Sequence, residues 1–379
     1  MKVGTKLLHG YTVLDEYTGA ASVPKYQTST FHQYDPSKFS KYLYTRFSNP
    51  TRTAIEEATK IIDNAKYGIS FASGMAAISS VLFMFDKGDH IVACQDIYGG
   101  AFKFMTEVLP KYGIEVSFVD ETNLESWEKA IKSNTKAFYM ETPSNPTLKI
   151  TDIRGVSDIA KKHGIITILD NTFMTPLLQK SLELGVDIVL NSATKFLNGH
   201  SDVIAGLVAT NDDFYGPKIA DFQLTVGNGL SVEDSWLLLR GLKTMHVRMK
   251  KSCENALEIA KFLETNDKIK KVYYPGLESH KGHDIHMKQA INGGALISFD
   301  VGSYENAVKV MENVHVPIVA VSLGGVESIL SFPARMSHAS MPVEERLKQG
   351  VTDGLLRFSV GIEDIEDLIE DLRQALDKL

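Results

Sequence analysis

The feature that most constrains this chain is a series of short apolar runs, most of them separated by helical stretches. The runs lie at residues 90–94, 114–119, 136–140, 165–170, 187–191 and 205–210. Strands that alternate with helices predict a mostly parallel, doubly wound sheet. The gap at 192–204 is too short for a full crossover helix, so we expect the last run to join the sheet antiparallel.

The two ends of the chain differ from this alternating middle. Residues 26–50 show no sustained period, so we interpret the first fifty residues as an arm, and a helical pattern begins at Pro50. Residues 211–231, with three glycines and a proline, form the candidate domain junction. Beyond it lie a helical pattern at 232–264, strand-like runs at 269–274, 295–300 and 355–360, and an amphipathic helix at 363–379. We therefore expect an arm (1–50), a large domain (51–231) and a smaller C-terminal α/β domain (232–379).

Charge and cysteine content exclude several classes of function. The net charge is −7, and no block of five or six basic residues occurs, so we expect no nucleic-acid partner. Cys94 and Cys253 are isolated, which argues against disulfides and thiolate metal cages and favours a reducing cytoplasm. No run of about 18 apolar residues and no signal-peptide pattern occurs, so we expect no membrane association. We interpret the histidines of 280–286 as part of a surface loop and expect no metal site.

The candidate chemistry lies where the predicted strands end. Sequence signatures of dinucleotide-binding, P-loop, zincin and α/β-hydrolase proteins are missing. The run Ser73-Gly74-Met75 joins a β-like segment to a helix with small first residues, and free N–H groups at such a helix start can hold a phosphate. A serine cap with a tight turn is the alternative interpretation of this run.

An acid and a lysine follow two neighbouring strands. Asp170 emerges from an apolar strand, either as a turn cap or as a carboxylate that keeps a pyridinium nitrogen protonated. Lys195 follows the next strand, flanked by Ser192 and Thr194, and a desolvated lysine can form a Schiff base with an aldehyde. A helix start and hydroxyls for a phosphate, an acid for a ring nitrogen and a lysine for an aldehyde together match the groups of pyridoxal 5'-phosphate (PLP). We call the helix start at Ser73-Gly74-Met75 the phosphate cup.

These residues lie within a longer resemblance. The chain resembles the trans-sulfuration (Cys/Met metabolism) PLP-dependent enzymes, most closely cystathionine γ-lyase and cystathionine β-lyase. The matching segments are 44–52, 71–77, 98–100, 141–146, 170–173, 192–195, 199–202, 322–325 and 356–361. The resemblance implies an aspartate-aminotransferase-like fold (fold type I) with a mostly parallel, seven-stranded-type sheet, and a homotetramer built as a dimer of active-site dimers.

The resemblance also implies a role for each matching residue. Lys195 bonds the PLP aldehyde and Asp170 pairs with the ring nitrogen, while Tyr98 stacks on the ring and serves as acid or base. The residues implied to hold the phosphate are Gly74, Met75, Ser192 and Thr194, with Tyr44 and Arg46 reaching it from the arm of a neighbouring subunit. Those implied to hold the substrate carboxylate are Asn145, Ser322 and Arg357.

We therefore expect a PLP-dependent C–S lyase of cysteine and methionine metabolism that acts on a small sulfur amino acid. Cystathionine γ-lyase, which releases cysteine, 2-oxobutanoate and ammonia, is the first hypothesis. Cystathionine β-lyase, methionine γ-lyase, an activated-homoserine synthase and a non-catalytic regulatory protein of the same fold stay open. The chain departs from cystathionine-preferring members at Leu43, Lys103 and Val321, where acid, arginine and acid are usual, so we expect broad activity that includes homocysteine and cysteine.

Overall fold

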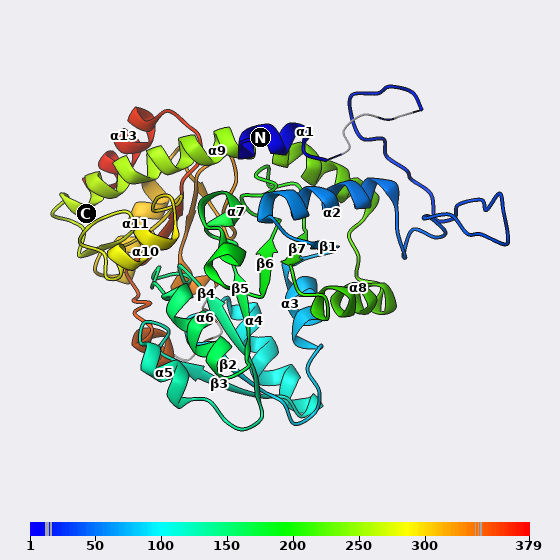
Figure 1. Cartoon of the computed structure of the whole chain (residues 1–379). Coiled ribbons are helices and arrows are strands. Elements are labelled where there is room, and N and C mark those ends of the chain that lie inside the picture. Colours follow the sequence, from blue (N-terminus) through cyan, green and yellow to red (C-terminus); the bar gives the residue numbers. More distant parts are fainter. Residues whose placement is uncertain (12–14, 16, 338, 340, 342) are drawn as a thin grey trace.

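The computed structural model describes residues 1–11, 15, 17–337, 339, 341 and 343–379. They form two sheets with helices packed around them, and an arm projects from this body (Figure 1). The arrangement confirms the predicted α/β fold class.

The larger sheet has seven strands in the part of the chain that the structure describes. Strands β2 to β6 run parallel, whereas β7 is antiparallel to both of its neighbours, β6 and β1. The spatial order is β1 (Tyr67–Phe71), β7 (Gly206–Thr210), β6 (Ile188–Ser192), β5 (Ile166–Asp170), β4 (Thr135–Glu141), β2 (His90–Cys94) and β3 (Glu115–Val119). All six predicted runs are strands of this sheet, and the antiparallel direction of the last one is confirmed.

Burial explains why these strands were recognisable. β2 and β7 are buried along their whole length, because helices pack on both faces of the sheet, and such strands have continuous apolar sequences. The helices of this part are α2 (Pro50–Asp63), α3 (Gly74–Leu82), α4 (Gly99–Lys103), α5 (Leu124–Lys129), α6 (Ile153–Lys162), α7 (Thr175–Leu178) and α8 (Tyr215–Val226). A π-helix at Phe104–Val108 and 3₁₀-helices at Leu109–Tyr112 and Ser181–Leu184 complete it.

The second sheet lies in the C-terminal part of the chain. Its strand order is β10 (Ile318–Val319), β11 (Ile329–Ser331), β12 (Leu355–Ser359), β9 (Leu296–Asp300) and β8 (Lys271–Tyr273). The helices here are α9 (Val232–Glu264), α10 (His283–Gln289), α11 (Tyr304–Asn313), α12 (Val343–Lys348) and α13 (Ile365–Leu376), with a 3₁₀-helix at Pro333–Arg335. Strands β10 and β11 were not predicted, since two or three residues are too few for a periodic pattern.

Helix α9 connects the two parts of the molecule. It begins at the candidate junction, where the Ser231 side chain caps it by accepting the N–H of Asp234 at 3.0 Å. Along its length it contacts α1 and α2 as well as β8, β9 and α13, and Figure 1 shows it running along one side of the body.

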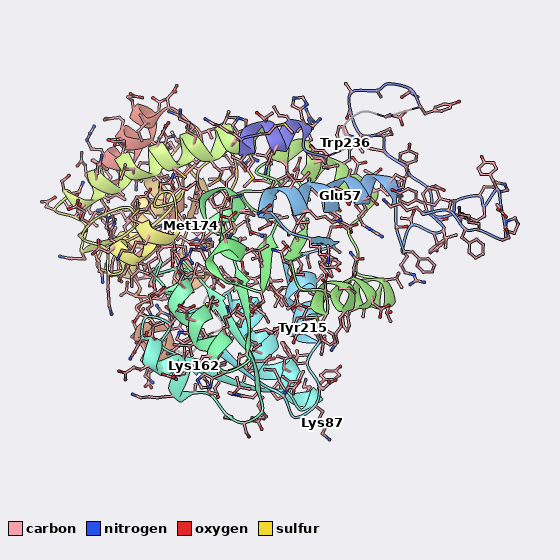
Figure 2. All side chains as sticks on the ribbon, in the orientation of Figure 1. Glu57, Lys87, Lys162, Met174, Tyr215 and Trp236 are labelled. Carbon is pink, nitrogen blue, oxygen red and sulfur yellow. The ribbon has the colours of Figure 1, made fainter. Side chains whose placement is uncertain are left out.

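The start of the chain is more ordered than the predicted arm. Helix α1 (Val3–His9) packs against α2 and α9 and buries Leu7 completely. Seven residues with one fully buried apolar side chain give a weak pattern, which is why the helix was missed. Residues 26–48 extend away from both sheets (Figure 1). Trp236, labelled in Figure 2, fixes the root of this arm by donating its Nε1–H to the carbonyl of Val23 at 3.0 Å.

The histidines of 280–286 are not in a surface loop, so that prediction was wrong. His280 and His286 are buried, and His283 begins α10. Ring nitrogens of all three meet backbone carbonyls at 2.8 Å, those of Leu148, Pro275 and Asn292. These contacts make the histidines structural. Among the described residues, no cluster suited to a metal ion and no helix able to cross a membrane is found.

Candidate active site

The candidate site lies at the carboxyl ends of neighbouring parallel strands. Asp170 is the last residue of β5 and lies directly opposite Glu141, the last residue of β4, in the sheet register. Lys195 lies three residues beyond the end of β6, in the following turn. Side chains at this edge of an open α/β sheet are placed to bind ligands.

Lys195 is partly buried and held by a residue of the C-terminal part. Its Nζ donates to Ser322 Oγ at 2.6 Å. Burial lowers the pKa of Lys195 to about 8, and the positive charge of Arg357 contributes in the same direction. A lysine with such a pKa is partly neutral near neutral pH, so it can act as a nucleophile and as a base.

The turn that carries Lys195 is fixed from α9. Arg248 is buried, and its guanidinium donates to the carbonyls of Phe196 at 2.9 Å and Leu197 at 3.2 Å. The carbonyl groups of this turn therefore have partners that do not depend on a ligand.

Asp170 is buried and tied to the neighbouring strand through Thr172. Its Oδ1 accepts hydrogen bonds from the Thr172 backbone N–H at 3.0 Å and from the Thr172 hydroxyl at 2.5 Å. Thr172 Oγ1 in turn accepts the N–H of Ser192 at 2.8 Å. Burial raises the pKa of Asp170 and the hydrogen bonds from Thr172 oppose that rise, because they favour the ionised carboxylate.

The predicted phosphate cup is the start of α3. The Ser73 hydroxyl caps this helix by accepting the N–H of Ala76 at 3.0 Å, and Gly74 and Met75 are its first residues. A β-carbon added at Gly74 would lie only 2.9 Å from Cβ and Oγ of Ser192. The glycine therefore lets the helix start approach the Ser192–Thr194 turn.

Arg357 contacts the other two residues expected to bind a substrate carboxylate, Asn145 and Ser322. From β12, its Nη1 donates to Asn145 Oδ1 at 2.9 Å and its Nη2 to the Ser322 carbonyl at 2.8 Å. The side chain is 4% exposed, and its Nε has no hydrogen-bond partner within the described residues. A buried guanidinium with an unused donor is suited to a bidentate contact with a carboxylate.

Tyr98 precedes α4 and is 44% exposed. Its backbone N–H donates to Glu141 Oε2 at 2.8 Å. A β-carbon added at Gly100 would lie 2.6 Å from Tyr98 Cε1 and 3.0 Å from Met75 Sδ. The tyrosine ring and the start of α3 therefore lie close together across a glycine.

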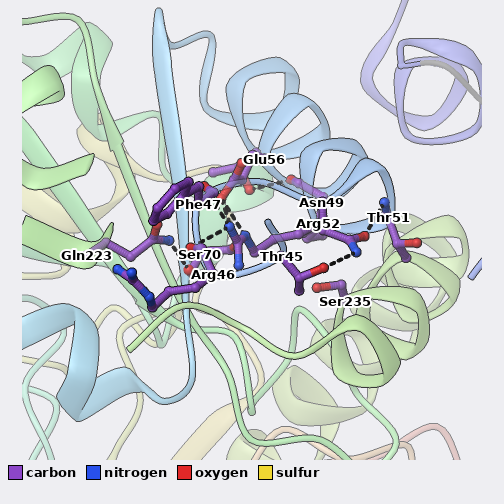
Figure 3. Close-up of polar contacts among 12 residues, drawn as sticks. Thr45, Arg46, Phe47, Asn49, Thr51, Arg52, Glu56, Ser70, Gln223 and Ser235 are labelled. Atoms are coloured by element: carbon purple, nitrogen blue, oxygen red, sulfur yellow. Dashed lines mark hydrogen bonds and ion pairs between the residues drawn. The ribbon is translucent and has the colours of Figure 1, made fainter. Parts of the chain in front are cut away.

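Tyr44 and Arg46 lie on the projecting arm instead of beside Lys195 of the same chain. The Arg46 guanidinium donates to the carbonyl of Leu224 at 2.7 Å, at the end of α8. Figure 3 shows how Arg52 of α2 holds this segment by donating to the carbonyls of Arg46 at 3.2 Å and Phe47 at 2.9 Å. The Tyr44–Arg46 segment is thus anchored to the body at its root while its side chains remain in large part exposed.

The three positions that depart from cystathionine-preferring relatives are dispersed within one chain. Leu43 lies on the arm next to Tyr44, and Lys103 ends α4, where it is exposed 3.9 Å from Glu107. Val321 is 63% exposed and precedes Ser322. Of these three residues, only Val321 is next in the chain to a residue that contacts Lys195, namely Ser322.

These residues fit PLP. A helix start with a close-approach glycine suits a phosphate, a buried acid suits a ring nitrogen, and a lysine with a lowered pKa suits an aldehyde. No role was predicted from the sequence for Glu141, Thr172 or Arg248. Glu141 shared the signal that identified Asp170, an acid at the end of an apolar strand, whereas Arg248 inside a long helix carried no such signal.

Comparisons with known proteins agree with this geometry. Residues 4–377 match the family model described as Cys/Met metabolism PLP-dependent enzyme. Cystathionine beta-lyase MetC of Bacillus subtilis (strain 168) is 52% identical over 99% of this chain and 96% of its own length. Cystathionine gamma-lyase of the same organism is 50% identical over the full length of both chains. The crystal structure of cystathionine gamma-lyase from Lactobacillus plantarum complexed with L-serine has a TM-score of 0.97, at 42% identity and with 100% and 99% coverage.

Proposed function

The chain belongs to the Cys/Met metabolism family of PLP-dependent enzymes, and from this premise we propose that it is a C–S lyase of trans-sulfuration. Its principal reaction is cleavage of cystathionine at the γ-carbon, which yields cysteine, 2-oxobutanoate and ammonia. The observation that carries the proposal is the partly buried Lys195, held 2.6 Å from Ser322 beside the carboxylate-binding Arg357.

Bound PLP supplies an aldehyde for the substrate amine and a ring that accepts the electrons of a broken bond. Gly74, Met75, Ser192 and Thr194 would hold its phosphate, Asp170 would pair with its ring nitrogen, and Tyr98 would stack on its ring. Lys195 accepts and donates the protons at the substrate carbons, because its lowered pKa leaves a usable fraction of neutral amine. Ser322 orients the Lys195 amine.

Arg357 fixes the other end of the substrate. Its guanidinium is oriented by Asn145 and by the Ser322 carbonyl, so a bound α-carboxylate meets a preorganised donor. Because Ser322 contacts both Lys195 and Arg357, the base and the carboxylate site keep a fixed relation to each other.

Cystathionine β-lyase is the second candidate, and the 52% identical β-lyase of Bacillus subtilis favours it. The two reactions need the same residues and differ in which carbon–sulfur bond breaks. The apolar Leu43 and Val321 offer no partner to the distal ammonium of cystathionine, so we also propose activity toward homocysteine and cysteine.

We also propose how the chain is divided into domains, how it assembles and where it acts. The projecting part of the arm (1–50), residues 26–48, reaches a neighbouring subunit in a cytoplasmic homotetramer. Residues 51–231 form the PLP-binding domain and residues 232–379 the C-terminal domain. The exposed aromatic residues Tyr34, Phe39, Tyr44 and Phe47 of the arm support a contact with a second copy. The buried, unpaired Cys94 and Cys253 are consistent with a reducing compartment.

Product analysis with cystathionine tests the proposal. Cysteine and 2-oxobutanoate are the expected products, whereas homocysteine and pyruvate would assign the protein to the β-lyases. Borohydride reduction of the PLP-loaded protein, followed by peptide mapping, should place the label on Lys195. A protein that binds no PLP, or one labelled on a peptide without Lys195, contradicts the assignment, and Lys195→Ala is the matched control.

A further inference from the structure

Glu141 is a buried acid at the centre of the candidate site to which no role has been given. It ends β4, is 5% exposed, and accepts the backbone N–H of Tyr98 on Oε2 at 2.8 Å. Its own backbone N–H donates to Cys94 Sγ at 3.2 Å. Glu141 therefore connects the end of β4, beside Asp170, to the backbone of Tyr98, the residue proposed to cover the cofactor ring.

The surroundings of Glu141 are rich in acids. Asp170 of β5 is its direct neighbour in the sheet. The other titratable groups that interact with it electrostatically are Tyr139 of its own strand and, from neighbouring segments, Asp96, Glu121, Cys94 and Arg357. Arg357 is the positive one among these. Burial and the charge of Asp170 raise the pKa of Glu141 well above its usual range.

Two adjacent buried carboxyl groups do not both ionise readily, so one of them holds a proton. Asp170 accepts two hydrogen bonds from Thr172 on the same oxygen, and these favour its ionised form. Glu141 accepts only one backbone hydrogen bond, from Tyr98, so its ionised form is stabilised less than that of Asp170. The hydrogen bonding therefore assigns the proton to Glu141 and the negative charge to Asp170.

We propose that Glu141 is a positioning residue that acts as a neutral carboxylic acid, holding Tyr98 over the cofactor ring and leaving Asp170 ionised to meet the ring nitrogen. The inference rests on the proposed function, since it assigns PLP to this site. It also explains how Arg357 stays available. An ionised Glu141 would compete with the substrate carboxylate for the guanidinium, whereas a neutral one does not.

Two substitutions separate this role from that of a charged residue. Glu141→Gln keeps the shape and an acceptor oxygen but cannot ionise, and Glu141→Met keeps the approximate volume without an acceptor. The first measurement is the dissociation constant for PLP. It is obtained by adding PLP to the PLP-free protein and recording the quenching of intrinsic fluorescence. Glu141→Gln should stay within about threefold of wild type, and Glu141→Met should bind PLP about tenfold more weakly, because it leaves the Tyr98 N–H unpaired.

The second measurement reads the proton directly. Infrared spectra of the wild-type protein at neutral pH should contain the carbonyl stretch of a protonated carboxyl group that Glu141→Gln lacks. Glu121→Gln is the matched control, because burial raises the pKa of Glu121 to about 7 and its band should fade as the pH rises through that value. This measurement needs only the Gln variant, so it stays decisive if Glu141→Met fails to fold.

Each outcome supports or overturns the inference. Equal loss of PLP affinity in the Gln and Met variants would show that the negative charge of Glu141 is needed and would overturn it. Wild-type affinity in Glu141→Met, or an infrared spectrum unchanged in Glu141→Gln, would do the same. The KM for cystathionine should not rise in Glu141→Gln, because Arg357 stays available to the substrate carboxylate, and a rise would overturn the inference. If the wild-type protein itself binds no PLP, the proposed function fails instead, and the infrared comparison still tests the proton on Glu141.

Discussion

Ser322 contacts Lys195 with its side chain and Arg357 with its backbone. Lys195 Nζ donates to Ser322 Oγ at 2.6 Å, and Arg357 Nη2 donates to the Ser322 carbonyl at 2.8 Å. Ser322 has a φ of 84°, in the left-handed region that non-glycine residues rarely occupy. Such a conformation costs about 1–3 kcal/mol and persists where the surrounding contacts fix it, as these two hydrogen bonds do.

The reactivity of Lys195 in the PLP-free protein should depend on pH with a midpoint near 8. Burial and then Arg357 lower its pKa to about that value, so the neutral amine becomes dominant above it. Arg357→Gln should move the midpoint upward, because loss of a nearby positive charge favours the ammonium form. Labelling with a limiting amine reagent at a series of pH values, read by mass spectrometry, measures both midpoints. Exposed Lys87, which projects from the body in Figure 2, is the internal reference. A lower midpoint in Arg357→Gln would contradict this account of Lys195.

Gly100→Ala should weaken PLP binding by about tenfold, because the new β-carbon would displace the Tyr98 ring, from which it would lie 2.6 Å. The PLP dissociation constant is the quantity to measure. If the effect acts through Tyr98, the double variant Tyr98→Ala/Gly100→Ala should bind no worse than Tyr98→Ala alone. Additive losses would show that Gly100 acts independently of Tyr98, for example through Met75.

Two inactive variants should restore activity when mixed. Arg46 lies on the arm while Lys195 lies in the body, so a hybrid of Arg46→Ala and Lys195→Ala subunits contains some sites with both native residues if the arm serves a neighbour. Activity should appear after subunit exchange and be absent from each variant alone. Demonstrated exchange without any activity would show that Arg46 does not act across subunits.

The catalytic efficiency for homocysteine or cysteine should lie within about tenfold of that for cystathionine, a difference of about 1.4 kcal/mol in transition-state binding. The apolar Leu43 and Val321 offer no partner to the distal ammonium of cystathionine, and because Val321 is exposed in the single chain, water can reach that charge and keep cystathionine a substrate. Parallel kinetics on cystathionine, homocysteine, cysteine and methionine decide the matter. Val321→Glu should raise the preference for cystathionine, and a wild-type preference of a thousandfold would contradict the argument.

The sequence by itself determined the elements of the fold. Periods of about two and 3.6 residues, together with Pro50 at the start of α2, are local properties, and they located strands β2 to β7 of the large sheet and helices α2 and α9. The ends of these strands also indicated Asp170 and Lys195, because a polar residue at the end of an apolar run, or a few residues beyond it, is visible in the sequence alone. Short elements such as β10 and α1 were missed, since they span too few residues to show a period.

The tertiary structure decided which residues meet. Lys195 and Ser322 are 127 positions apart, and Arg357 and Asn145 are 212 apart, and no local pattern relates such pairs. The state of Glu141 depends on the register that sets it opposite Asp170, and the burial of His280 and His286 depends on distant carbonyl groups. Periodicity reports which face of an element is buried, whereas hydrogen bonds, desolvation and pKa depend on the atoms that packing brings within a few ångströms.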